Sequence, residues 1–403
     1  MAKTSWRKED NIVLIAYLWL LIQIIIGYNL VLPLVLYIFS TFKRKYNPPI
    51  GEGREFDYGI IVTSYEQVYT IPDVVESLLK LEHSNFHIYV VADKCDISGL
   101  HFTDGRVTIF RPEETLASNT KSHFYAINRF KRPHECVTII DSDNLVLPNY
   151  LTELDLYFNA GFEAVQGVRE AKNLNTTFAR LDAARDIYYH FYDGKILFKL
   201  GSSATLAGSG MAFKTQLYRD CLENNDVIGA GFDKVLQYRI LSRNLRIAFA
   251  ADAIVFDEKT SKSDQLVKQR SRWINTWFKY FGYGFKLLFK SSRNQFVFGL
   301  ILLRPPLFIF LLLSLVFMFL NIFISATAVV VWLCAFIAFV LGFYIALAKS
   351  ETDKRIYQSL VNIPKFIFYQ VLSLLKVRKA NKHSVATTHY VHSAADKPAE
   401  NES

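Results

Sequence analysis

The 403-residue sequence predicts an α/β fold: a mostly parallel sheet with helices on both faces, joined to transmembrane and interfacial helices. From Tyr58 onward, short apolar segments that suit strands alternate with amphipathic segments that suit helices. One of these strands ends in two closely spaced carboxylates, and several apolar runs elsewhere are long enough to cross a bilayer. Together these observations indicate a water-facing domain on a membrane anchor.

The composition agrees with this organisation. The chain is 51% hydrophobic and contains 33 Phe, yet 21% of its residues are charged. Its formal net charge of +9 suits an anionic lipid surface and a polyanionic substrate. Nucleic acid would suit this charge too, but the sequence has no zinc-ligand spacing, RRM signature or concentrated basic helix, so we expect no nucleic-acid partner. The four cysteines are far apart and follow no metal pattern, which indicates reduced thiols facing the cytosol.

Residues 1–48 are predicted to form an N-terminal transmembrane anchor. Its span, about residues 12–40, is long enough for one tilted crossing and too short for two. The apolar region is too long for a signal peptide, and no small-residue cleavage site follows it. Basic residues at 43–45 favour the cytosol for the end of the span, although those at 3, 7 and 8 nearly balance them.

Residues 55–265 are predicted to form a cytosolic domain. The expected strands are 58–63, 86–92, 107–110, 137–140 and 163–168, and the expected helices are 71–81, 121–130 and a later one that ends near Leu241. Strands that alternate with helices of this length imply a mostly parallel sheet covered on both faces.

The segments after this domain return to membrane-associated patterns. Residues 266–304 mix aromatic and basic side chains, which fits helices lying in the headgroup layer. Residues 305–348 contain two apolar runs, 305–324 and 327–348, and each is long enough to span. Arg304 is expected at the cytosolic boundary, where its side chain can reach the headgroups.

Charge predicts the orientation of this pair of spans. Lys and Arg flank its outer ends, whereas the linker around Ser325 carries no charge, so both outer ends are expected in the cytosol. Residues 349–392 are predicted to contain a cytosolic interfacial helix, with a further span at 356–375 as the alternative. The polar tail, residues 393–403, is expected to be disordered.

The carboxylate pair is Asp141 and Asp143, which follow the apolar strand 137–140. At a strand end, where the chain turns away, both side chains can reach one ligand. Oxygen ligands at this spacing suit Mg²⁺ or Mn²⁺ shared with substrate phosphates, and open α/β sheets bind ligands at the carboxyl ends of their strands. The alternative is a turn after a core strand, in which Asp143 or Asn144 caps the next helix.

A second set of candidates lies on one predicted helix. Gln269, Arg272 and Trp273 are spaced i, i+3 and i+4, so they share one helix face. An amide, a guanidinium and an indole suit a diphosphate and a sugar. An amphipathic interfacial helix would also carry Arg and Trp, so this alternative stays open. The small residues 208–210 would let a sugar approach the backbone closely, or would simply form a turn.

Four features follow one another in the chain: Val62-Thr-Ser-Tyr65-Glu66, Val90-Val-Ala-Asp93, Asp141-Ser-Asp143 and Gln269-Arg-Ser-Arg272-Trp273, the last preceded by Gly231-Phe-Asp233. This ordered set resembles the membrane-bound family-2 glycosyltransferases, the branch that includes cellulose and hyaluronan synthases, over roughly residues 57–289. The resemblance implies a nucleotide-sugar-binding domain of the GT-A type, inversion at the anomeric centre and a divalent metal, Mg²⁺ or Mn²⁺.

The resemblance also implies roles on the donor side. Tyr65 and Asp93 would contact the base of the nucleotide, with Asp93 accepting from a ring N–H, and Lys121 would lie near the nucleotide. Asp141 would lie by the ribose and diphosphate, and Asp143 would ligate the metal beside it.

On the acceptor side, the resemblance implies that Gln269, Arg272 and Trp273 hold the diphosphate and the acceptor end. Asp233 would be the catalytic base, since a carboxylate is needed to take the proton of the acceptor hydroxyl. Phe232 departs from the family, which usually has Glu at this position, and this implies an altered acceptor pocket. The gating-loop motif Phe-x-Val-Thr-x-Lys is also missing, which argues against a synthase that threads a long polymer through its own pore.

The sequence therefore predicts an inverting, metal-dependent glycosyltransferase that uses a UDP-sugar to build a cell-surface polysaccharide at the cytosolic face of the plasma (inner) membrane. The expected partners are a UDP-sugar donor, a glycan or lipid-linked acceptor, membrane lipids, and export or polymerisation proteins. Two alternatives remain: transfer to a polyprenyl-phosphate carrier, and an inactive membrane-anchored subunit that only binds the sugar nucleotide.

Overall fold

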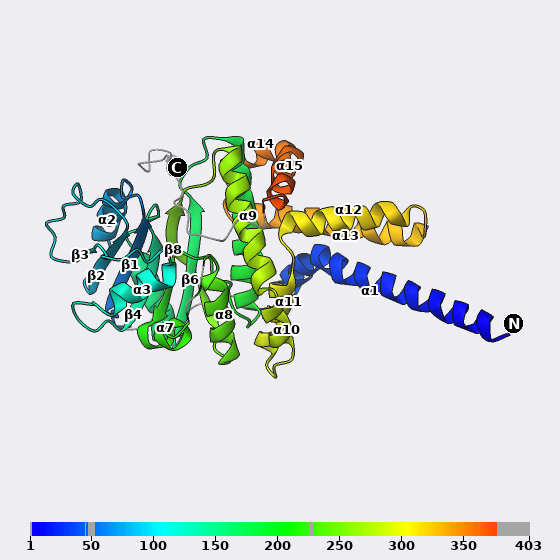
Figure 1. Ribbon diagram of the computed structural model, residues 1–403, viewed down its shortest axis with the longest axis horizontal. Helices are drawn as coiled ribbons and strands as arrows, with labels where there is room; N and C mark the ends of the chain where they lie inside the picture. The colour runs from blue at the N-terminus through cyan, green and yellow to red at the C-terminus, as the bar shows by residue number, and fades with distance from the viewer. Residues whose placement is uncertain (1, 45, 47–52, 226, 228, 377–403) are drawn as a thin grey trace.

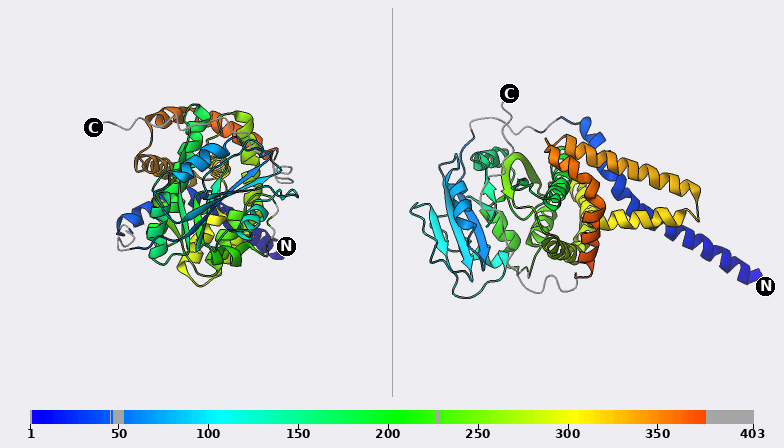
Figure 2. Two further views of the ribbon diagram at one scale, coloured as in Figure 1. Left: turned by 90° about the vertical axis from the view of Figure 1, so that its left-hand side faces the viewer. Right: turned by 90° about the horizontal axis from the view of Figure 1, so that it is seen from above.

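An α/β domain carries a group of long helices that project from one side of it (Figures 1 and 2). The computed structural model describes residues 2–44, 46, 53–225, 227 and 229–376. The expected disordered tail, 393–403, and the end of the segment 349–392 lie outside the described residues.

One eight-stranded sheet forms the centre of the domain, in the order β3-β2-β1-β4-β7-β6-β8-β5. Its pairings make β1, β2, β3, β4, β6 and β8 run in one direction and β5 and β7 in the other, which confirms the mostly parallel sheet. The sequence did not indicate β5, β7 or β8. The strands are β1 (Tyr58–Tyr65), β2 (Phe86–Asp93), β3 (Val107–Phe110), β4 (Cys136–Asp141), β5 (Leu145–Val146), β6 (Ala164–Ala171), β7 (Met211–Lys214) and β8 (Ile247–Asp257).

Helices cover both faces of the sheet, as predicted. Tyr58 of β1 donates a hydrogen bond to Asp155 of α4, at 2.6 Å. Tyr89 of β2 pairs in register with Ile61, three residues after Tyr58, and therefore points to the other face. There it stacks on Phe130 just beyond α3, with ring centroids 4.6 Å apart. The helices of the domain are α2 (Ile71–Leu79), α3 (Asn119–Ile127), α4 (Tyr150–Asn159), α7 (Thr215–Leu222) and α8 (Phe232–Ser242).

A helical segment after β6 joins the sheet to the projecting helices. It consists of α5 (Thr177–Tyr189), the π-helix η1 (His190–Ile196) and α6 (Leu197–Lys199). The hydroxyl of Tyr192 donates to the carbonyl of Gly342, at 2.8 Å. Asp193 forms an ion pair with Arg304, and both side chains are 5% exposed. Arg304 is thus buried against a carboxylate, so the expectation that it reaches the headgroups is wrong: pairing removes the need to reach water.

Two helices are long and apolar enough to cross a membrane, within the part of the chain that the structure describes: Val13–Thr41 of α1 (Ala2–Thr41) and α13 (Ala326–Ala348). α12 (Leu307–Asn321) has 15 residues, and is therefore about 22 Å long. It reaches the length of a span only together with α11 (Arg293–Leu303), from which it is bent by 73°. Of the two spans predicted in 305–348, α13 is long enough on its own, and α12 reaches that length as part of a bent pair with α11, because two prolines interrupt the helix between them.

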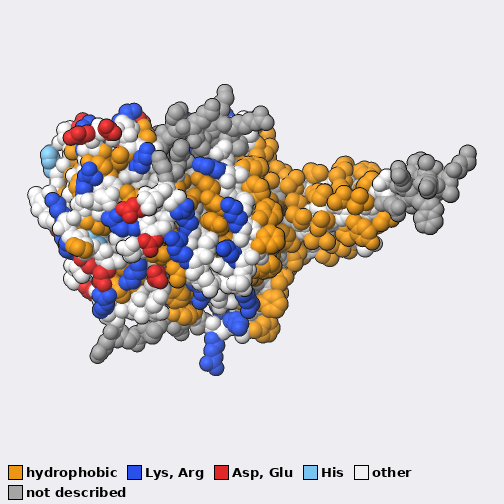
Figure 3. Space-filling view, turned by 60° about the horizontal axis from the view of Figure 1, so that its bottom comes forward, with side chains coloured by type: hydrophobic (Ala, Val, Ile, Leu, Met, Phe, Trp, Pro, Cys, Tyr) orange, Lys and Arg blue, Asp and Glu red, His pale blue; other side chains and the backbone are white. Residues whose placement is uncertain are grey.

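A polar contact ties the projecting helices together. The side-chain oxygen of Gln23 in α1 accepts hydrogen bonds from Asn321 at the end of α12, at 2.5 Å, and from Trp332 of α13, at 2.9 Å. Polar bonds of this kind hold helices together where lipid surrounds them. The outer surfaces of these helices are apolar, and the apolar surface continues onto the adjoining edge of the domain (Figure 3).

The remaining helices lie between the sheet and the projecting helices. They are α9 (Ser263–Tyr280), α10 (Gly282–Leu288), α14 (Lys354–Ser359), the 3-10 turn η2 (Leu360–Asn362) and α15 (Ile363–Leu374). α15 packs against α9 and α5. The single interfacial helix expected within 349–392 is therefore two short helices, because Pro364 starts α15 anew. Neither is long enough to span, so the alternative of a third span at 356–375 is wrong.

Candidate active site

The strand ends bring the expected donor-side residues to one edge of the sheet. Tyr65, the last residue of β1, pairs in register with Asp93, the last residue of β2. Asp141, the last residue of β4, pairs with Thr63 on the other side of β1. β8 ends at Asp257 on this same edge, beside the end of β6. Residues that are more than 70 positions apart in the chain, such as Tyr65 and Asp141, therefore end side by side.

Asp93 holds the loop that leads into α3. It is 2% exposed, and its two carboxylate oxygens accept from the backbone N–H groups of Leu116, at 3.0 Å, and Ala117, at 2.7 Å. Ser118 caps α3 by accepting from the N–H of Lys121, at 3.4 Å. The loop thus places Lys121, whose side chain is exposed, in the first turn of α3. Asp93 therefore fixes the loop from which α3, the helix that carries Lys121, begins.

The carboxylate pair after β4 is held through its backbone. The N–H of Asp141 donates to the hydroxyl of Ser209, at 3.0 Å, and the side-chain amide of Asn144 donates to the same oxygen, at 2.7 Å. The ammonium of Lys172 donates to the carbonyl of Asp143, at 3.2 Å. The alternative of a helix cap is wrong, because α4 begins at Tyr150, beyond the reach of Asp143.

The donor set at this pair fits a divalent cation that phosphates also ligate. Asp141 is half-buried and Asp143 is 9% exposed. Over the described residues, no group of three or more His, Cys, Asp or Glu is placed to hold a metal. Two carboxylates without a third such ligand leave positions for phosphate oxygens and water, which is how Mg²⁺ is usually bound. A closed structural zinc site, with four protein ligands, does not fit.

A glycine loop lies against the carboxylate pair. Gly208 and Gly210 have φ values of 90° and 65°, which non-glycine residues rarely adopt. The side chain of Gln166 in β6 pins this loop, because its amide donates to the carbonyl of Ser209, at 3.1 Å, and its oxygen accepts from the N–H of Ala207, at 2.9 Å. The loop is therefore fixed by the sheet rather than by its own turn.

Asp233 lies in the first turn of α8, as predicted. The turn begins at Gly231, where a Cβ atom would come within 2.6 Å of Thr276 in α9, so only glycine lets the two helices approach this closely. Lys234 forms an ion pair with Asp233, at 3.0 Å, and also donates to the carbonyl of Leu206, at 3.2 Å. The start of α8 thus contacts both the glycine loop and α9.

Phe232 belongs to the core. It is 5% exposed, and its ring lies edge-on to His123 of α3, with centroids 5.1 Å apart. Burial lowers the pKa of His123 to about 3, so this imidazole is neutral at pH 7, and it bonds to the hydroxyl of Tyr218 at 2.7 Å. A glutamate in place of Phe232 would be buried among apolar groups and a neutral histidine. The departure from the family pattern is therefore accommodated by packing.

The three expected residues of α9 share a face and contact the protein. The side-chain oxygen of Gln269 accepts from the hydroxyl of Thr260, at 3.0 Å. Arg272 is half-buried, and burial lowers its pKa below the ordinary value. Two guanidinium groups, those of Arg185 and Arg270, lie over the ring of Trp273, at 4.2 and 4.0 Å from its centroid.

A buried charge network, which sequence reasoning missed, joins α9 to the strand ends. Lys259 pairs with Asp257, at 2.5 Å, and with Asp186, at 2.6 Å. Arg169 pairs with Asp257, at 2.5 Å. The members of this network are Arg169 of β6, Asp182, Arg185 and Asp186 of α5, Asp257 of β8, Lys259 after it and Arg270 of α9. Only the helical spacing of 182, 185 and 186 could have signalled it.

The network reaches the carboxylate pair through Arg169. Burial lowers the pKa of Arg169, but the carboxylates of Asp257 and Asp186, and then those of Asp141 and Asp143, raise it above its usual value. Arg169 therefore stays charged and supplies positive potential beside the two carboxylates. Such a charge is also what a diphosphate near this edge requires.

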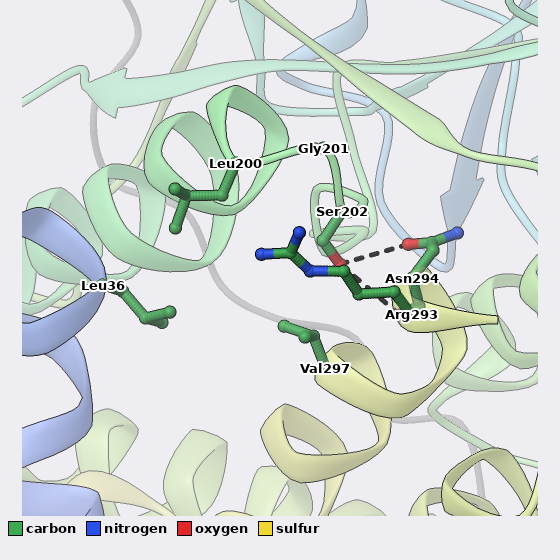
Figure 4. Close-up of a pocket in the computed structure, with 7 residues that line it drawn as sticks. All are labelled: Leu36, Leu200, Gly201, Ser202, Arg293, Asn294 and Val297. Carbon is green, nitrogen blue, oxygen red and sulfur yellow. Dashed lines mark hydrogen bonds between the residues drawn. The ribbon is translucent and has the colours of Figure 1, made fainter. Parts of the chain in front are cut away.

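The cavity drawn in Figure 4 lies away from these residues, where α1 meets the domain. Its volume is about 40 Å³. The side chain of Asn294 accepts from the hydroxyl of Ser202, at 3.1 Å, on one wall. Its lining consists of Leu36, Leu200, Gly201, Ser202, Arg293, Asn294 and Val297, and includes none of the residues expected in the active site.

Residues 56–276, more than half of the chain, match the family described as "Glycosyltransferase like family 2". Among solved structures, the chain is similar to the mannosyltransferase PcManGT from Pyrobaculum calidifontis, in complex with GDP-Man and Mn²⁺. The two are 14% identical with a TM-score of 0.58, over 89% of this chain and 99% of that chain. It is also similar to TarS 1–349 of S. aureus in complex with UDP-GlcNAc, at 12% identity and a TM-score of 0.43, over 81% of this chain and 90% of that chain.

No curated protein matches the chain in sequence. At 14% identity, the likeness to PcManGT shows the fold, and it confirms the predicted GT-A type of α/β domain.

Proposed function

This chain belongs to the glycosyltransferase-like family 2, and we propose that it transfers a sugar from a UDP-sugar to a glycan, with inversion at the anomeric carbon. The observation that carries the proposal is that β1, β2 and β4 end at one edge of the sheet. Their last residues are Tyr65, Asp93 and Asp141, and Asp143 follows two residues after Asp141. Ligands of open α/β sheets bind at such an edge.

On the donor side, Tyr65 and Asp93 contact the base of the nucleotide, and Lys121 lies near it. The hydrogen bonds from Leu116 and Ala117 to Asp93 support this role, because they fix the carboxylate in one orientation. The donor base itself is open to test. Since PcManGT was solved with GDP-Man, GDP-mannose is the first alternative to a UDP-sugar.

At the diphosphate, Asp141 and Asp143 hold Mg²⁺ or Mn²⁺, and the Mn²⁺ in the PcManGT complex supports this choice. When bound, the cation neutralises charge on the departing diphosphate. Arg272 donates hydrogen bonds to the same group, and a guanidinium suits it because its fork of N–H donors matches phosphate oxygens. Burial around Arg272 strengthens that interaction.

At the acceptor, Asp233 takes the proton of the attacking hydroxyl as that oxygen bonds to the anomeric carbon. Attack from the side opposite the diphosphate inverts this carbon. Gln269 and Trp273 hold the acceptor end. The position of Asp233 supports its role, because the start of α8 contacts both the glycine loop beside Asp141 and the helix that carries Trp273.

A lipid-linked acceptor, such as a polyprenyl phosphate, is the second candidate. The observation that favours it is the packing of α9 against α15, together with the apolar surface that continues from the projecting helices onto the adjoining edge of the domain (Figure 3). An acceptor held in the membrane would reach α9 from this side. Export or polymerisation proteins would then complete a cell-surface polysaccharide.

The donor is tested with purified protein in detergent, a panel of UDP- and GDP-sugars, and a lipid extract as the source of acceptors. We expect release of UDP from one UDP-sugar, dependent on Mn²⁺ or Mg²⁺ and abolished by EDTA. Release of GDP alone would correct the donor. Binding of a sugar nucleotide without release from any donor would favour the inactive subunit.

We place the α/β domain on the cytosolic face of the plasma (inner) membrane. The basic residues that flank α12 and α13 support this orientation. A cysteine at Ser325, before α13, should react with an impermeant maleimide in intact cells, in a background where Cys334 is replaced by Ser. A cysteine at Ser350, just after α13, is the matched control and should not react. The reverse pattern would overturn the orientation.

A further inference from the structure

The packing around Trp273 is unusual because two cations share one aromatic ring. Arg270 precedes Trp273 by three residues on α9, whereas Arg185 comes from α5. Their guanidinium carbons lie 4.0 and 4.2 Å from the ring centroid. Each contact alone is a normal cation–π interaction, but two like charges this close repel each other. Something must compensate for that repulsion.

One carboxylate, that of Asp182, provides the compensation. Its Oδ1 atom forms an ion pair with Arg270 and lies 3.3 Å from Nη2 of Arg185. The side chains of Asp182 and Arg270 are 4% and 3% exposed. Arg185 has a second partner in Asp186. For Arg270, by contrast, the Nε and Nη1 atoms are buried without a hydrogen-bond partner among the described residues.

Arg270 is therefore held mainly by Asp182 and by the ring of Trp273. Burial, followed by repulsion from Arg185, lowers the pKa of Arg270 to about 10, although Asp182 and Asp186 raise it. Loss of the Asp182 charge would leave two buried cations with one carboxylate between them, that of Asp186. A buried cation without a partner moves toward water when it can, and here it would leave the indole.

We propose that Asp182 is a positioning residue for Trp273: it holds Arg270 and Arg185 over the indole and thereby fixes the ring at the acceptor end of the site. The effect on transfer rests on the proposed function, which puts Trp273 at the acceptor. The effect on the ring does not, since it follows from the contacts alone. The two effects can therefore be measured separately.

The contact is tested by ¹⁹F NMR of protein labelled with 5-fluorotryptophan. The chain has five tryptophans, and Trp273→Phe identifies the signal of Trp273. We expect Asp182→Asn to shift or broaden this signal. Arg185→Lys keeps the charge but loses the planar group that stacks on the ring, so it should shift the same signal. An unchanged Trp273 signal in folded Asp182→Asn protein would overturn the proposal.

Asp155→Asn is the matched control. Asp155 is another buried carboxylate, 6% exposed, and its oxygens bond to Tyr58 and His83 at the other end of the sheet. Both variants remove a buried charge and both should lower the thermal midpoint. Only Asp182→Asn should move the Trp273 signal. If Asp155→Asn moved it equally, the signal would report general loosening of the domain, and the proposal would fail.

The consequence for the reaction is measured in membranes from cells that express each variant, as incorporation of labelled sugar from the sugar nucleotide that the wild-type chain uses in the donor panel. We expect Asp182→Asn to lower transfer per folded molecule by about 10- to 100-fold, the loss that misplacement by about 1 Å can cause. The dissociation constant of UDP, measured by calorimetry, should change by less than about twofold, an energy difference of about 0.4 kcal/mol. Unchanged transfer despite a shifted Trp273 signal would overturn the role in positioning.

A further variant, Asp182→Glu, keeps the test decisive if Asp182→Asn does not fold. Asp182→Glu retains the charge on a longer side chain, so it should fold, keep both arginines paired and give a Trp273 signal between those of wild type and Arg185→Lys. A signal from Asp182→Glu identical to wild type, with reduced transfer, would contradict the proposal. Absence of transfer by the wild-type chain with every donor would instead refute the proposed function, and the NMR result would still decide the contact.

Discussion

The two ends of the sheet use the same residue types in different ways. At the amino ends of the strands, carboxylates are enclosed by neutral or well-paired groups. Asp57, just before β1, accepts from Arg132 at 2.8 and 2.9 Å and bonds to His134 at 2.8 Å. His134 in turn bonds to the hydroxyl of Tyr89, at 2.8 Å. These bonds tie the residues just before β1 and β4 to the middle of β2.

At the carboxyl ends, charges from several elements meet within a small volume. Arg169 of β6 and Asp257 of β8, both half-buried, join the buried Asp186 of α5 in one network. Arg169 and Arg185 each have a buried Nε atom without a hydrogen-bond partner, among the described residues. Such unsatisfied donors are rare in protein interiors and call for an explanation. The difference supports the proposal that the carboxyl ends hold a polyanionic sugar nucleotide, whereas the amino ends contribute to stability.

The largest expected effect of a substitution at the carboxyl ends concerns Asp233. Asparagine keeps the size and polarity of this side chain but cannot take a proton. Asp233→Asn should therefore bind the sugar nucleotide nearly as well as wild type, whereas its transfer rate should fall by about 10²–10⁴-fold, the usual contribution of a general base. Single-turnover kinetics and calorimetry measure the two quantities.

Asp252→Asn, a change at an exposed carboxylate of β8, is the control for Asp233→Asn. It should leave both the rate and the affinity unchanged. If Asp233→Asn transferred sugar within about threefold of wild type, a difference of only about 0.65 kcal/mol in barrier height, Asp233 would not be the base.

A smaller effect is expected for Asp143→Ala, in the affinity for UDP. Wild type should bind UDP more tightly with Mn²⁺ than with EDTA, because Asp143 would hold a cation that neutralises charge on the diphosphate. The variant should lose this difference, with a fall in affinity of about 10- to 100-fold, comparable to the loss of a metal-site partner. Calorimetry with and without Mn²⁺ measures both affinities for UDP. Unchanged dependence on Mn²⁺ would refute the metal site.

The smallest expected effect is on the pH dependence of stability, and it concerns His87 at the amino end of β2. Burial lowers the pKa of His87 to about 4, against about 6.5 for an unfolded histidine. The unfolded chain thus binds more protons between these values, so stability is complete above pH 6.5 and falls as the pH drops toward 4. In His87→Gln, the drop in thermal midpoint between pH 7 and pH 5 should be smaller by about 2–4 °C.

The contribution of His87 depends on its neutral form, which bonds to the hydroxyl of Thr108 at 2.8 Å. His101, near β3, makes a suitable control because its side chain is exposed, and His101→Gln should not alter the pH dependence. An equal pH dependence in wild type and His87→Gln would show that other groups set the acid sensitivity of this end.

Much of the fold could be predicted because local patterns determine it. Strands such as β2, buried at all of its positions, are read directly as apolar runs. β8 is hard to predict because its four alanines and the charged Asp252 weaken the apolar signal. The length of α12 could not be read either. Hydropathy shows that residues 305–324 are apolar, but the two prolines and the packing against α1 decide where the helix begins and ends.

In the candidate site, too, some residues could be predicted from the sequence and others only from the fold. Asp141 and Asp143 could be proposed from a short pattern at a strand end, whereas Asp233 could be proposed only from the resemblance to the family. The charge network was missed because its members come from β6, α5, β8 and α9, and only the folded chain brings them together. The same holds for Asp182, because its partner Arg270 lies 88 positions away in the sequence.

The most direct test of the difference between the two ends compares Asp143→Asn with Asp155→Asn, measuring thermal midpoint and Mn²⁺-dependent release of UDP in the same preparations. We expect Asp143→Asn to keep its midpoint within about 2 °C and to lose release. Asp155→Asn should lose about 3–12 °C, from hydrogen bonds to a buried charge worth about 1.5–3 kcal/mol, and keep release per folded molecule. Loss of release in folded Asp155→Asn, or retained Mn²⁺-dependent release in a destabilised Asp143→Asn, would contradict this account.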